Sequence, residues 1–362
     1  MHVGVQHIFT SHSYGDITDG QVFAEEVQTA LWAEELGFDS VWPVEHHFFD
    51  YSFCPDNTEF LAYLAGRTSR IKLGTAAVIL PWNEPLRVAE KISMLDHLSG
   101  GRALFGMGRG LSRREYAPFR GIEMDESRER FDEASAMICE ALEAGFIQGD
   151  GPFYPQPRTE IRPRPERSFA DRRYSVANSE DSVDAAARNG ATMLMFAERE
   201  WEKRLPSIER YRAGFRQIHG REAPPVMLAD FVYCAGTAEE AKDRARFGMG
   251  NYLTSLLEHY ELMNDHLKDV KGYAKYGEQV DALNTIGYEG FMRVFLKSTT
   301  WGTPGQIIDT LRSRREVIGP FDITGCFRYG GLPIDEVEAN MRLFAAEVLP
   351  ELHAWSDERA AA

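Results

Sequence analysis

Short apolar segments alternate with amphipathic segments along nearly the whole chain, and this alternation limits the possible folds more than any single motif does. The segments expected to be strands are Val3 to Phe9, Ser40 to Glu45, Lys72 to Leu80, Ala103 to Met107, Tyr174 to Ala177, Thr192 to Phe196, Val226 to Cys234 and Ile323 to Arg328. Apolar residues at helical spacing fill most of the gaps between them. Strands joined through helices pair in parallel, so the pattern predicts an α/β fold with a parallel sheet.

The expected helices have recognisable ends, such as Gly37 after the first and Pro85 at the start of the third. They are Gln21 to Leu36, Glu59 to Arg67, Pro85 to Leu98, Arg128 to Leu142, Ser182 to Arg188, Trp201 to His219, Tyr252 to Leu267, Phe291 to Lys297, Pro304 to Ile318 and Ile334 to Val348. Two stretches interrupt the alternation. A Pro-rich excursion from Gly149 to Arg173 follows the fourth helix, and a helical insertion follows Thr237, before the last strand. The insertion is either a mobile lid or a static brace.

Eight strands separated by helices predict a single (β/α)8 TIM barrel of the α/β class, and residues 1–362 are expected to form one domain. Counting strands leaves a doubly wound sheet open. However, no Gly-x-Gly-x-x-Gly turn follows the first strand, where a dinucleotide-binding fold most needs it. In a barrel the carboxyl ends of all strands face one mouth, so the residues that follow each strand are the candidates for a site.

Composition excludes several classes of protein. The 43% of hydrophobic residues can form a sizeable core, and the formal charge of −16 argues against a nucleic-acid partner. The cysteines are far apart and without a Cys-x-x-Cys pair, so buried free thiols in a reducing compartment are expected at Cys54, Cys139, Cys234 and Cys326. No charged and apolar leader opens the sequence, and no apolar run approaches ~18 residues. A cytoplasmic protein that does not span a membrane is therefore expected.

The second strand ends in a carboxylate and two imidazoles, Glu45, His46 and His47. Neighbouring residues on a strand point to opposite faces, so at most one of the two histidines is expected to face the site directly. The same geometry makes a two-histidine metal clamp improbable, and no metal site is predicted. The alternative is a capping loop in which one histidine is packed and the other is in contact with water.

Two later stretches are suited to binding an anion. Phe105 to Gly110 places glycines and Arg109 directly after the fourth strand, where backbone can approach a phosphate and a guanidinium can grip it. Asn178, Ser179 and Ser182 stand at the start of the helix after the fifth strand, where backbone donors and the helix dipole favour phosphate. The alternatives are a Gly-rich turn with a surface arginine, and plain N-capping by Ser179 or Ser182.

In their order and separations, these motifs resemble the bacterial luciferase-like family of flavin-dependent monooxygenases, whose members are eight-stranded βα barrels. The matching segments cover most of the chain: Glu45-His46-His47, Thr75-Ala76-Ala77-Val78, Ser99-Gly100-Gly101-Arg102, Gly108-Arg109-Gly110-Leu111, Arg130-Phe131-Asp132-Glu133 and Gly302-Thr303-Pro304. Bacterial luciferase has a glutamate where Asn178 stands and a reactive cysteine where Gly108 stands. The light-emitting reaction itself is therefore not implied.

The resemblance implies a role for each matching position. His46 would lie near the reactive edge of the isoalloxazine and act as a base or hydrogen-bond donor, and Glu45 would orient that region. Ala76 and Ala77 would line the flavin ring, often through a cis peptide bond. Arg109 would bind the flavin phosphate, and the positions around that phosphate would be Asn178, Ser179 and Ser182.

The resemblance also implies a reaction. FMN, as FMNH2 supplied by a separate flavin reductase, would react with O2 to a C4a-peroxide and deliver one oxygen atom to a small, largely apolar organic substrate. Hydroxylation, epoxidation and Baeyer-Villiger insertion all stay open, and a homodimer is expected. The alternatives are a deazaflavin-dependent hydride-transfer oxidoreductase and a non-catalytic flavin-binding protein. Four large aromatic residues are candidates to border an apolar pocket, although such residues more often belong to the core: Phe9, Trp82, Phe196 and Trp301.

Overall fold

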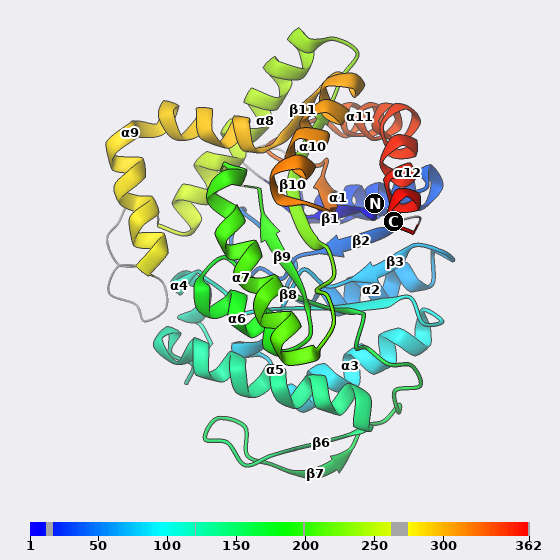
Figure 1. The fold of residues 1–362 in the computed structure, drawn as a ribbon, viewed down its shortest axis with the longest axis vertical. Helices are drawn as coiled ribbons and strands as arrows, with labels where there is room; N and C mark the ends of the chain where they lie inside the picture. Colours follow the sequence, from blue (N-terminus) through cyan, green and yellow to red (C-terminus); the bar gives the residue numbers. More distant parts are fainter. Residues whose placement is uncertain (12–16, 120, 198–199, 262–273, 361–362) are drawn as a thin grey trace.

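Parallel strands close into a barrel in the residues that the computed structural model describes, which are 1–11, 17–119, 121–197, 200–261 and 274–360 (Figure 1). In barrel order the strands are β1 (Val3–His7), β2 (Ser40–Pro43), β3 (Lys72–Gly74) with β4 (Val78–Ile79), β5 (Ala103–Gly108), β8 (Arg173–Val176), β9 (Thr192–Phe196), β10 (Val226–Cys234) and β12 (Phe321–Cys326). β9 pairs with β10 and β12 pairs with β1, so the sheet closes on itself. The predicted (β/α)8 TIM barrel is confirmed.

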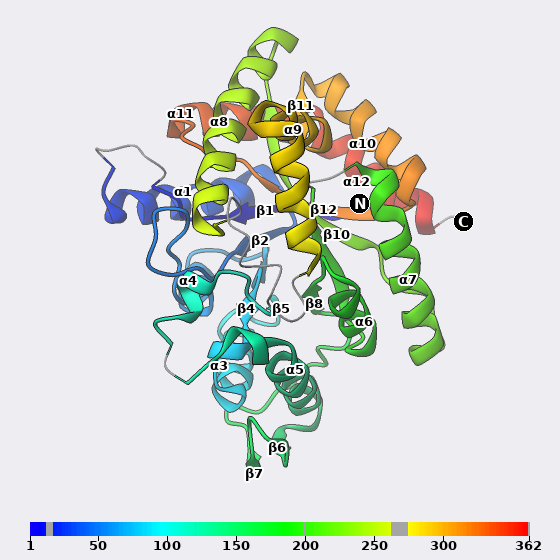
Figure 2. The same cartoon turned by 90° about the vertical axis from the view of Figure 1, so that its left-hand side faces the viewer.

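Helices surround the barrel on its outside (Figures 1 and 2). They are α1 (Asp19–Leu36), α2 (Asn57–Ala65), α3 (Pro85–Leu98), α4 (Arg113–Tyr116), α5 (Ser127–Ala144), α6 (Glu180–Arg188), α7 (Trp201–His219), α8 (Ala238–His259), α9 (Ala274–Ser298), α10 (Pro304–Ile318), α11 (Ile334–Glu347) and α12 (Leu349–Ala360). The start of the chain is tied to α12, because the amino group of Met1 donates a hydrogen bond to the carbonyl oxygen of Leu352 at 2.9 Å.

The third predicted strand is divided into β3 and β4 by Thr75, Ala76 and Ala77. At the break the Thr75 hydroxyl donates to the carbonyl of Gly106 at 2.7 Å and accepts from its N–H at 2.8 Å. At this point the Thr75 side chain, in place of backbone groups, makes the hydrogen bonds to Gly106 of β5. The Ala76–Ala77 peptide bond is cis, and the Asn57 amide at the start of α2 donates to the carbonyl of Ala77 at 3.1 Å.

The Pro-rich excursion contains strands that the sequence did not predict. β6 (Phe146–Gly149) and β7 (Gln156–Glu160) form an antiparallel hairpin, which lies at the opposite end of the molecule from α8 and α9 in both views (Figures 1 and 2). Pro157 fits in β7 because both strands of a two-stranded sheet have a free edge that needs no donor. The prolines of this stretch argue only against a helix or a central strand, so a hairpin outside the barrel is compatible with them, although no pattern in the sequence indicated it.

Two further elements were missed. β11 (Thr300–Gly302) pairs in parallel with β10 beyond the end of the barrel ladder. The last helix was expected to end near Pro350, but a new helix, α12, begins at Leu349. Proline is tolerated in the first turn of a helix, because the N–H it lacks would have no partner there.

The insertion before the last strand is largely helical, as predicted, and its described residues contain α8, α9 and α10 together with the short strand β11. α8 begins after Thr237, whose side chain accepts from the Glu240 N–H at 3.2 Å. Gly287, with φ of 67°, interrupts the helical geometry within α9. The second half of the helix predicted at Tyr252 to Leu267, like most of the loop predicted after Phe9, lies outside the described residues.

The base of the barrel is filled by Trp42, which is fully buried. Its indole N–H donates to the Ser40 hydroxyl at 2.6 Å, and its ring meets the edge of Tyr174 with centroids 4.7 Å apart. Glycine is required beside it: a Cβ at Gly4 would lie 2.7 Å from the indole nitrogen, and one at Gly74 would lie 2.3 Å from the ring. Trp42 therefore fills the space below the carboxyl-terminal mouth of the barrel.

The four cysteines are buried and free, as predicted from their spacing. Among the described helices, none is at once long and apolar enough to cross a membrane.

Candidate active site

A large pocket opens at the carboxyl ends of the barrel strands, with an empty volume of about 1380 Å³ that includes its open mouth. Its lining comes from several strand ends and from α8 and α9. All eight residues to which the sequence analysis gave a catalytic or cofactor-binding role line this one pocket: Glu45, His46, Ala76, Ala77, Arg109, Asn178, Ser179 and Ser182. They come from four different strand ends, which only the closed barrel brings together.

One wall of the pocket is flat because its side chains are small. Ala76 and Ala77 lie against β5, where a Cβ at Gly108 would be 3.2 Å from the Cβ of Ala77 and 3.0 Å from the side chain of Ile79. A larger residue at Gly108 would force these strands apart. Backbone and methyl groups therefore form a surface on which a planar ring can lie.

Glu45 fixes the position of this wall. Its carboxylate accepts from the backbone N–H of Ile79 at 3.0 Å, the indole of Trp82 at 2.6 Å and the amide of Asn83 at 2.9 Å. The side chain is almost completely buried. Glu45 therefore holds the segment after the cis peptide in place.

Arg109 and Asn178 follow two adjacent strands at the mouth of the barrel. β5 and β8 are adjacent parallel strands in which Met107 lies opposite Ser175, so the residues that follow both strands emerge at the same edge of the mouth. The Tyr116 hydroxyl donates a hydrogen bond to the Arg109 carbonyl, which ties α4 to this edge. A guanidinium and an amide thus face the pocket from neighbouring strands.

The two serines have different roles. Ser179 is the N-cap of α6, and it forms a capping box with Ser182. The Ser182 hydroxyl donates to the carbonyl of Ser179 at 2.8 Å and accepts from the N–H groups of Ser179 at 2.9 Å and Asn178 at 3.2 Å. Ser182 therefore shapes the turn, while Ser179 presents its hydroxyl at the positive end of the helix dipole.

The two adjacent histidines face different surroundings. His46 lines the pocket, whereas His47 packs its ring against Phe119 with centroids 5.1 Å apart. The nearest carboxylate oxygen to the His47 ring belongs to Glu45, at 3.6 Å. One histidine therefore faces the pocket and the other is packed, in agreement with the sequence argument that at most one would face it.

Glu115 from α4 holds His46 in place. Its Oε1 lies 2.9 Å from Nδ1 of His46 and accepts from the backbone N–H of His47 at 2.8 Å. Burial acts to raise the pKa of Glu115, but the neighbouring imidazoles of His46 and His259 hold it well below its ordinary value. An ionised carboxylate only accepts hydrogen bonds. Nδ1 of His46 must therefore carry a proton, which leaves Nε2 as its free nitrogen.

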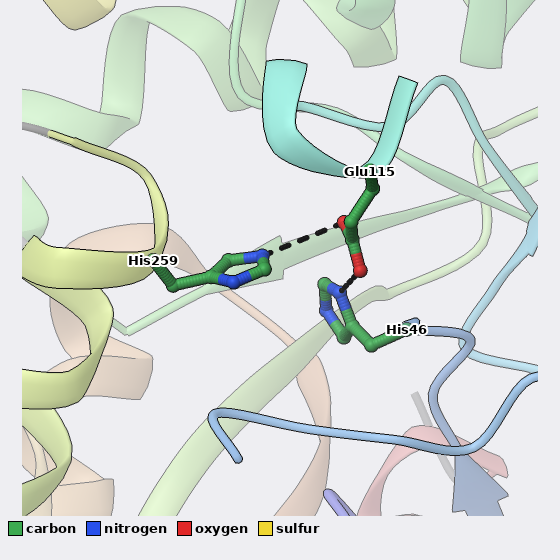
Figure 3. A group of neighbouring side chains, drawn as sticks. All are labelled: His46, Glu115 and His259. Atoms are coloured by element: carbon green, nitrogen blue, oxygen red, sulfur yellow. Dashed lines mark hydrogen bonds and ion pairs between the residues drawn. The ribbon is translucent and has the colours of Figure 1, made fainter. Parts of the chain in front are cut away.

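A second histidine approaches the same carboxylate from α8 (Figure 3). Nε2 of His259 lies 3.5 Å from Oε2 of Glu115, an ion-pair separation rather than a full hydrogen bond. Burial lowers the pKa of His259 below its ordinary value, so its ring is neutral near pH 7. The ligand atoms of His46, Glu115 and His259 lie within 4.8 Å of one another, a spacing within which a cation can be held. We assign them as a hydrogen-bonded group, because His46 and Glu115 already satisfy each other at 2.9 Å.

The rest of the pocket is apolar and largely aromatic. Its large side chains come from the loop after β2, from β9 and β10, and from α8, α9 and the segment after α8, and they are Tyr51, Phe196, Phe231, Tyr252, Tyr260 and Phe295. Of the four aromatics weighed from the sequence, only Phe196 lines the pocket. Phe9 belongs to the core, and Trp82 is stacked on Phe119 with centroids 5.2 Å apart. Trp301 packs against the core from β11.

Sequence reasoning missed three residues around the site. Glu115 had a signal, since a carboxylate soon after the glycines and Arg109 is unexpected in an anion-binding loop. His259 and Arg204 had none, because both lie within helices. Arg204 of α7 is buried, and its Nη1 lies 3.5 Å from the side-chain oxygen of Asn178. It therefore turns the amide N–H₂ of Asn178 away from itself.

Comparison with known proteins finds monooxygenases by sequence and by structure. A family model described as luciferase-like monooxygenase matches residues 1–319. The alkanal monooxygenase alpha chain of Photorhabdus luminescens is 27% identical over 325 residues, which is 88% of this chain and 89% of that protein. The crystal structure of monooxygenase RslO1 from Streptomyces bottropensis superimposes with a TM-score of 0.79 at 26% identity, covering 97% of this chain and 100% of that one.

Two more distant structures share the fold. The oxygenating constituent of 3,6-diketocamphane monooxygenase from Pseudomonas putida, a type II Baeyer-Villiger monooxygenase in complex with FMN, has a TM-score of 0.74 at 17% identity and covers 97% of this chain and 98% of that one. An F420-dependent secondary alcohol dehydrogenase has a TM-score of 0.70 at 15% identity, covering 96% and 98%. The fold thus accommodates both a flavin and a deazaflavin.

Proposed function

The chain belongs to the luciferase-like monooxygenase family, and on this premise we propose that it is the oxygenating component of a two-component, FMN-dependent monooxygenase. A separate flavin reductase supplies FMNH2. The enzyme transfers one atom of O2 to a small, largely apolar organic substrate. The single observation that carries this proposal is the convergence of His46, the Ala76–Ala77 pair, Arg109 and Asn178 on one pocket.

The residues at the edge of β5 and β8 suit a flavin phosphate. Arg109 offers a permanent positive charge, and Ser179 offers a hydroxyl at the start of α6. Arg204 directs the amide donors of Asn178 away from its own guanidinium. Ser182 contributes indirectly, because its hydroxyl is engaged by the turn that it stabilises.

The flat wall at Ala76, Ala77 and Gly108 suits an isoalloxazine ring. Any larger side chain at Gly108 would meet Ala77 and Ile79, so the space over the wall is kept for a ligand. Glu45 maintains this wall by binding the segment from Ile79 to Asn83. When bound, reduced FMN supplies the activation of O2, which no protein side chain can perform by itself.

The protein's own chemical contribution is centred on His46. With Nδ1–H held by Glu115, Nε2 can accept a proton from, or in the imidazolium form donate one to, a group in the pocket. The Glu115 carboxylate accepts the Nδ1 proton of His46 in either form of the ring. The aromatic wall excludes water, which protects the oxygenating step from side reactions and favours an apolar substrate.

The test is an incubation of the purified protein with chemically reduced FMN and ¹⁸O₂. The substrate panel contains a long-chain aldehyde, a bicyclic ketone and a hydroxylated polycyclic aromatic compound. Mass spectrometry is expected to find one ¹⁸O atom in a product. Absence of label from every product, with binding of FMN intact, would favour a non-catalytic flavin-binding protein.

The deazaflavin alternative is tested in parallel. Reduced deazaflavin and a ketone, without O2, would yield an alcohol and oxidised cofactor if the protein is a hydride-transfer enzyme. The proposal expects no such product. We further propose that residues 1–362 act as one domain in a homodimer, which sedimentation can test.

A further inference from the structure

The end of α8 and the short helix α4 are held together by three consecutive contacts. Arg113 binds Glu261 through two bonds of 2.6 and 2.7 Å, and Nη1 of Arg114 donates to the carbonyl of Glu258 at 3.3 Å. The third contact is the approach of His259 to Glu115. Two exposed contacts thus flank a buried one, so the position of His259 against Glu115 is fixed from both sides.

Aromatic rings fix the orientation of His259. The Tyr51 ring stacks on it with centroids 4.4 Å apart and an interplanar angle of 11°. The rings of Phe49 and Tyr260 meet it nearly edge-on, at 5.5 and 4.7 Å. The Tyr51 hydroxyl lies 3.0 Å from that of Tyr252, which anchors the stack to α8. The imidazole therefore has little freedom to turn, and Nε2 faces the carboxylate.

Only 2% of His259 is exposed, and no hydrogen bond is recorded for either ring nitrogen within the described residues. An imidazole in this setting is costly, and a hydrophobic residue would fill the same space without that cost. The contact of His259 with Glu115 must therefore provide the benefit that offsets this cost. Glu115 presents two oxygens: Oε1 serves His46 and the backbone of His47, and Oε2 lies 3.5 Å from Nε2 of His259.

We propose that His259 is a positioning residue: its Nε2–H holds Oε2 of Glu115, so that Oε1 keeps the proton of His46 on Nδ1 and leaves Nε2 of His46 for the reaction. This role of His259 rests on the proposed function, because the reaction in which Nε2 of His46 takes part is the oxygenation proposed above. The structural part of the proposal stands alone, because it concerns only the protonation pattern of three side chains. Their arrangement can be followed in Figure 3.

The first test measures tautomers in flavin-free protein labelled with ¹⁵N-histidine, at a pH where imidazoles are neutral. Long-range ¹H–¹⁵N spectra distinguish protonated from unprotonated ring nitrogens, and the His46→Gln and His259→Gln variants identify the two sets of signals. In the wild type, His46 is expected as the Nδ1–H tautomer and His259 as the Nε2–H tautomer. Finding either in the opposite form in the wild type overturns the proposal.

The second test compares two closely matched amides. In His259→Gln the side-chain N–H₂ can reach the place of Nε2, whereas in His259→Asn it is one carbon shorter and cannot. The Asn variant is expected to show a mixture of His46 tautomers, and the Gln variant is expected to keep the wild-type pattern. An unchanged His46 pattern in folded His259→Asn protein would sink the proposal.

The third test measures how much of the consumed oxygen is released as hydrogen peroxide. With reduced FMN, the Asn variant is expected to release several-fold more of the consumed oxygen as hydrogen peroxide than the Gln variant, and to do so over a shifted pH range. Other titratable and charged groups near His259 also influence this pH profile. They are His46, Tyr51, Arg114, Glu115 and Tyr260. Tautomers as expected without any turnover would refute the proposed function alone. Coupled turnover with equal peroxide release in both variants would refute the role of His259 alone.

Discussion

Oε1 of Glu115 lies 2.9 Å from Nδ1 of His46, although 69 residues separate the two in sequence. The contact joins the loop after β2 to the helix after β5 and passes over the end of β3 and β4, which lie between them in the barrel. It sets the proton on one nitrogen of the histidine and points the other into the pocket. The chemistry of the site therefore depends on a residue that no strand end presents directly.

Replacing His46 by Ala should preserve the fold and the binding of reduced FMN but break the coupling of oxygen consumption to product. The reason is that the imidazole handles a proton and adds little to ground-state binding. Peroxide release per O2 consumed is the measurement. His47→Ala serves as the control, since His47 does not line the pocket. A larger loss of coupling in the control would mean that the other histidine is the important one.

Replacing Arg109 by Ala should weaken FMN binding by roughly one to two orders of magnitude, because a charge-assisted contact contributes about 1.5 to 3 kcal/mol. Riboflavin lacks the phosphate, so its affinity should hardly change. Fluorescence titration of both ligands against both proteins measures the difference. Equal losses for FMN and riboflavin would show that Arg109 supports the ring or the fold instead.

The stability of the protein should fall on mild acidification partly because of His259. Burial lowers its pKa below the ordinary value of 6.5, so the unfolded chain binds the proton more readily than the folded one. The contribution is complete above pH 6.5 and is lost progressively below it, at up to about 1.4 kcal/mol per pH unit. Chemical unfolding at several pH values should therefore show a shallower decline in His259→Gln than in the wild type. Parallel curves would contradict the prediction.

Gly74→Ala should destabilise the barrel, because the new Cβ would lie 2.3 Å from the ring of Trp42. Overpacking of this kind costs about 1 to 3 kcal/mol, and the rigid indole cannot move aside. Gly305→Ala in α10 is the control. Nothing lies within 4 Å of its added Cβ, so it should be neutral or slightly stabilising. Thermal unfolding of the two variants should shift in different directions.

Arg314→Leu should cost about 3 to 5 kcal/mol, since it leaves a buried carboxylate without its cation. Nη1 of Arg314 lies 2.7 Å from Asp230, and both side chains are at most 1% exposed. The matched control is Arg210→Leu, which breaks an exposed pair with Asp184 at 2.6 Å and should cost less than about 1 kcal/mol. Similar losses in denaturant unfolding would indicate that the inner pair contributes little.

The sequence by itself determined the barrel. Strands buried on both faces must be apolar throughout, so Thr192–Phe196 and Val226–Cys234 were predicted with the bounds they have in the structure. Proline and glycine mark helix ends through backbone geometry alone, and α3 and α10 were likewise predicted without error. Since parallel strands end at one mouth, the positions of the eight candidate site residues also followed from the chain order.

Only the tertiary structure decided how those residues are used. Ser182 proved to be occupied by its own helix cap, and Glu45 by the segment it supports. Glu115 and His259 meet through contacts between α4 and α8, whose relative placement no local pattern encodes. Local propensities act over a few residues and therefore specify elements and their ends. The protonation of a buried group depends on every charge within several ångströms, and these come together only when distant parts of the chain have packed.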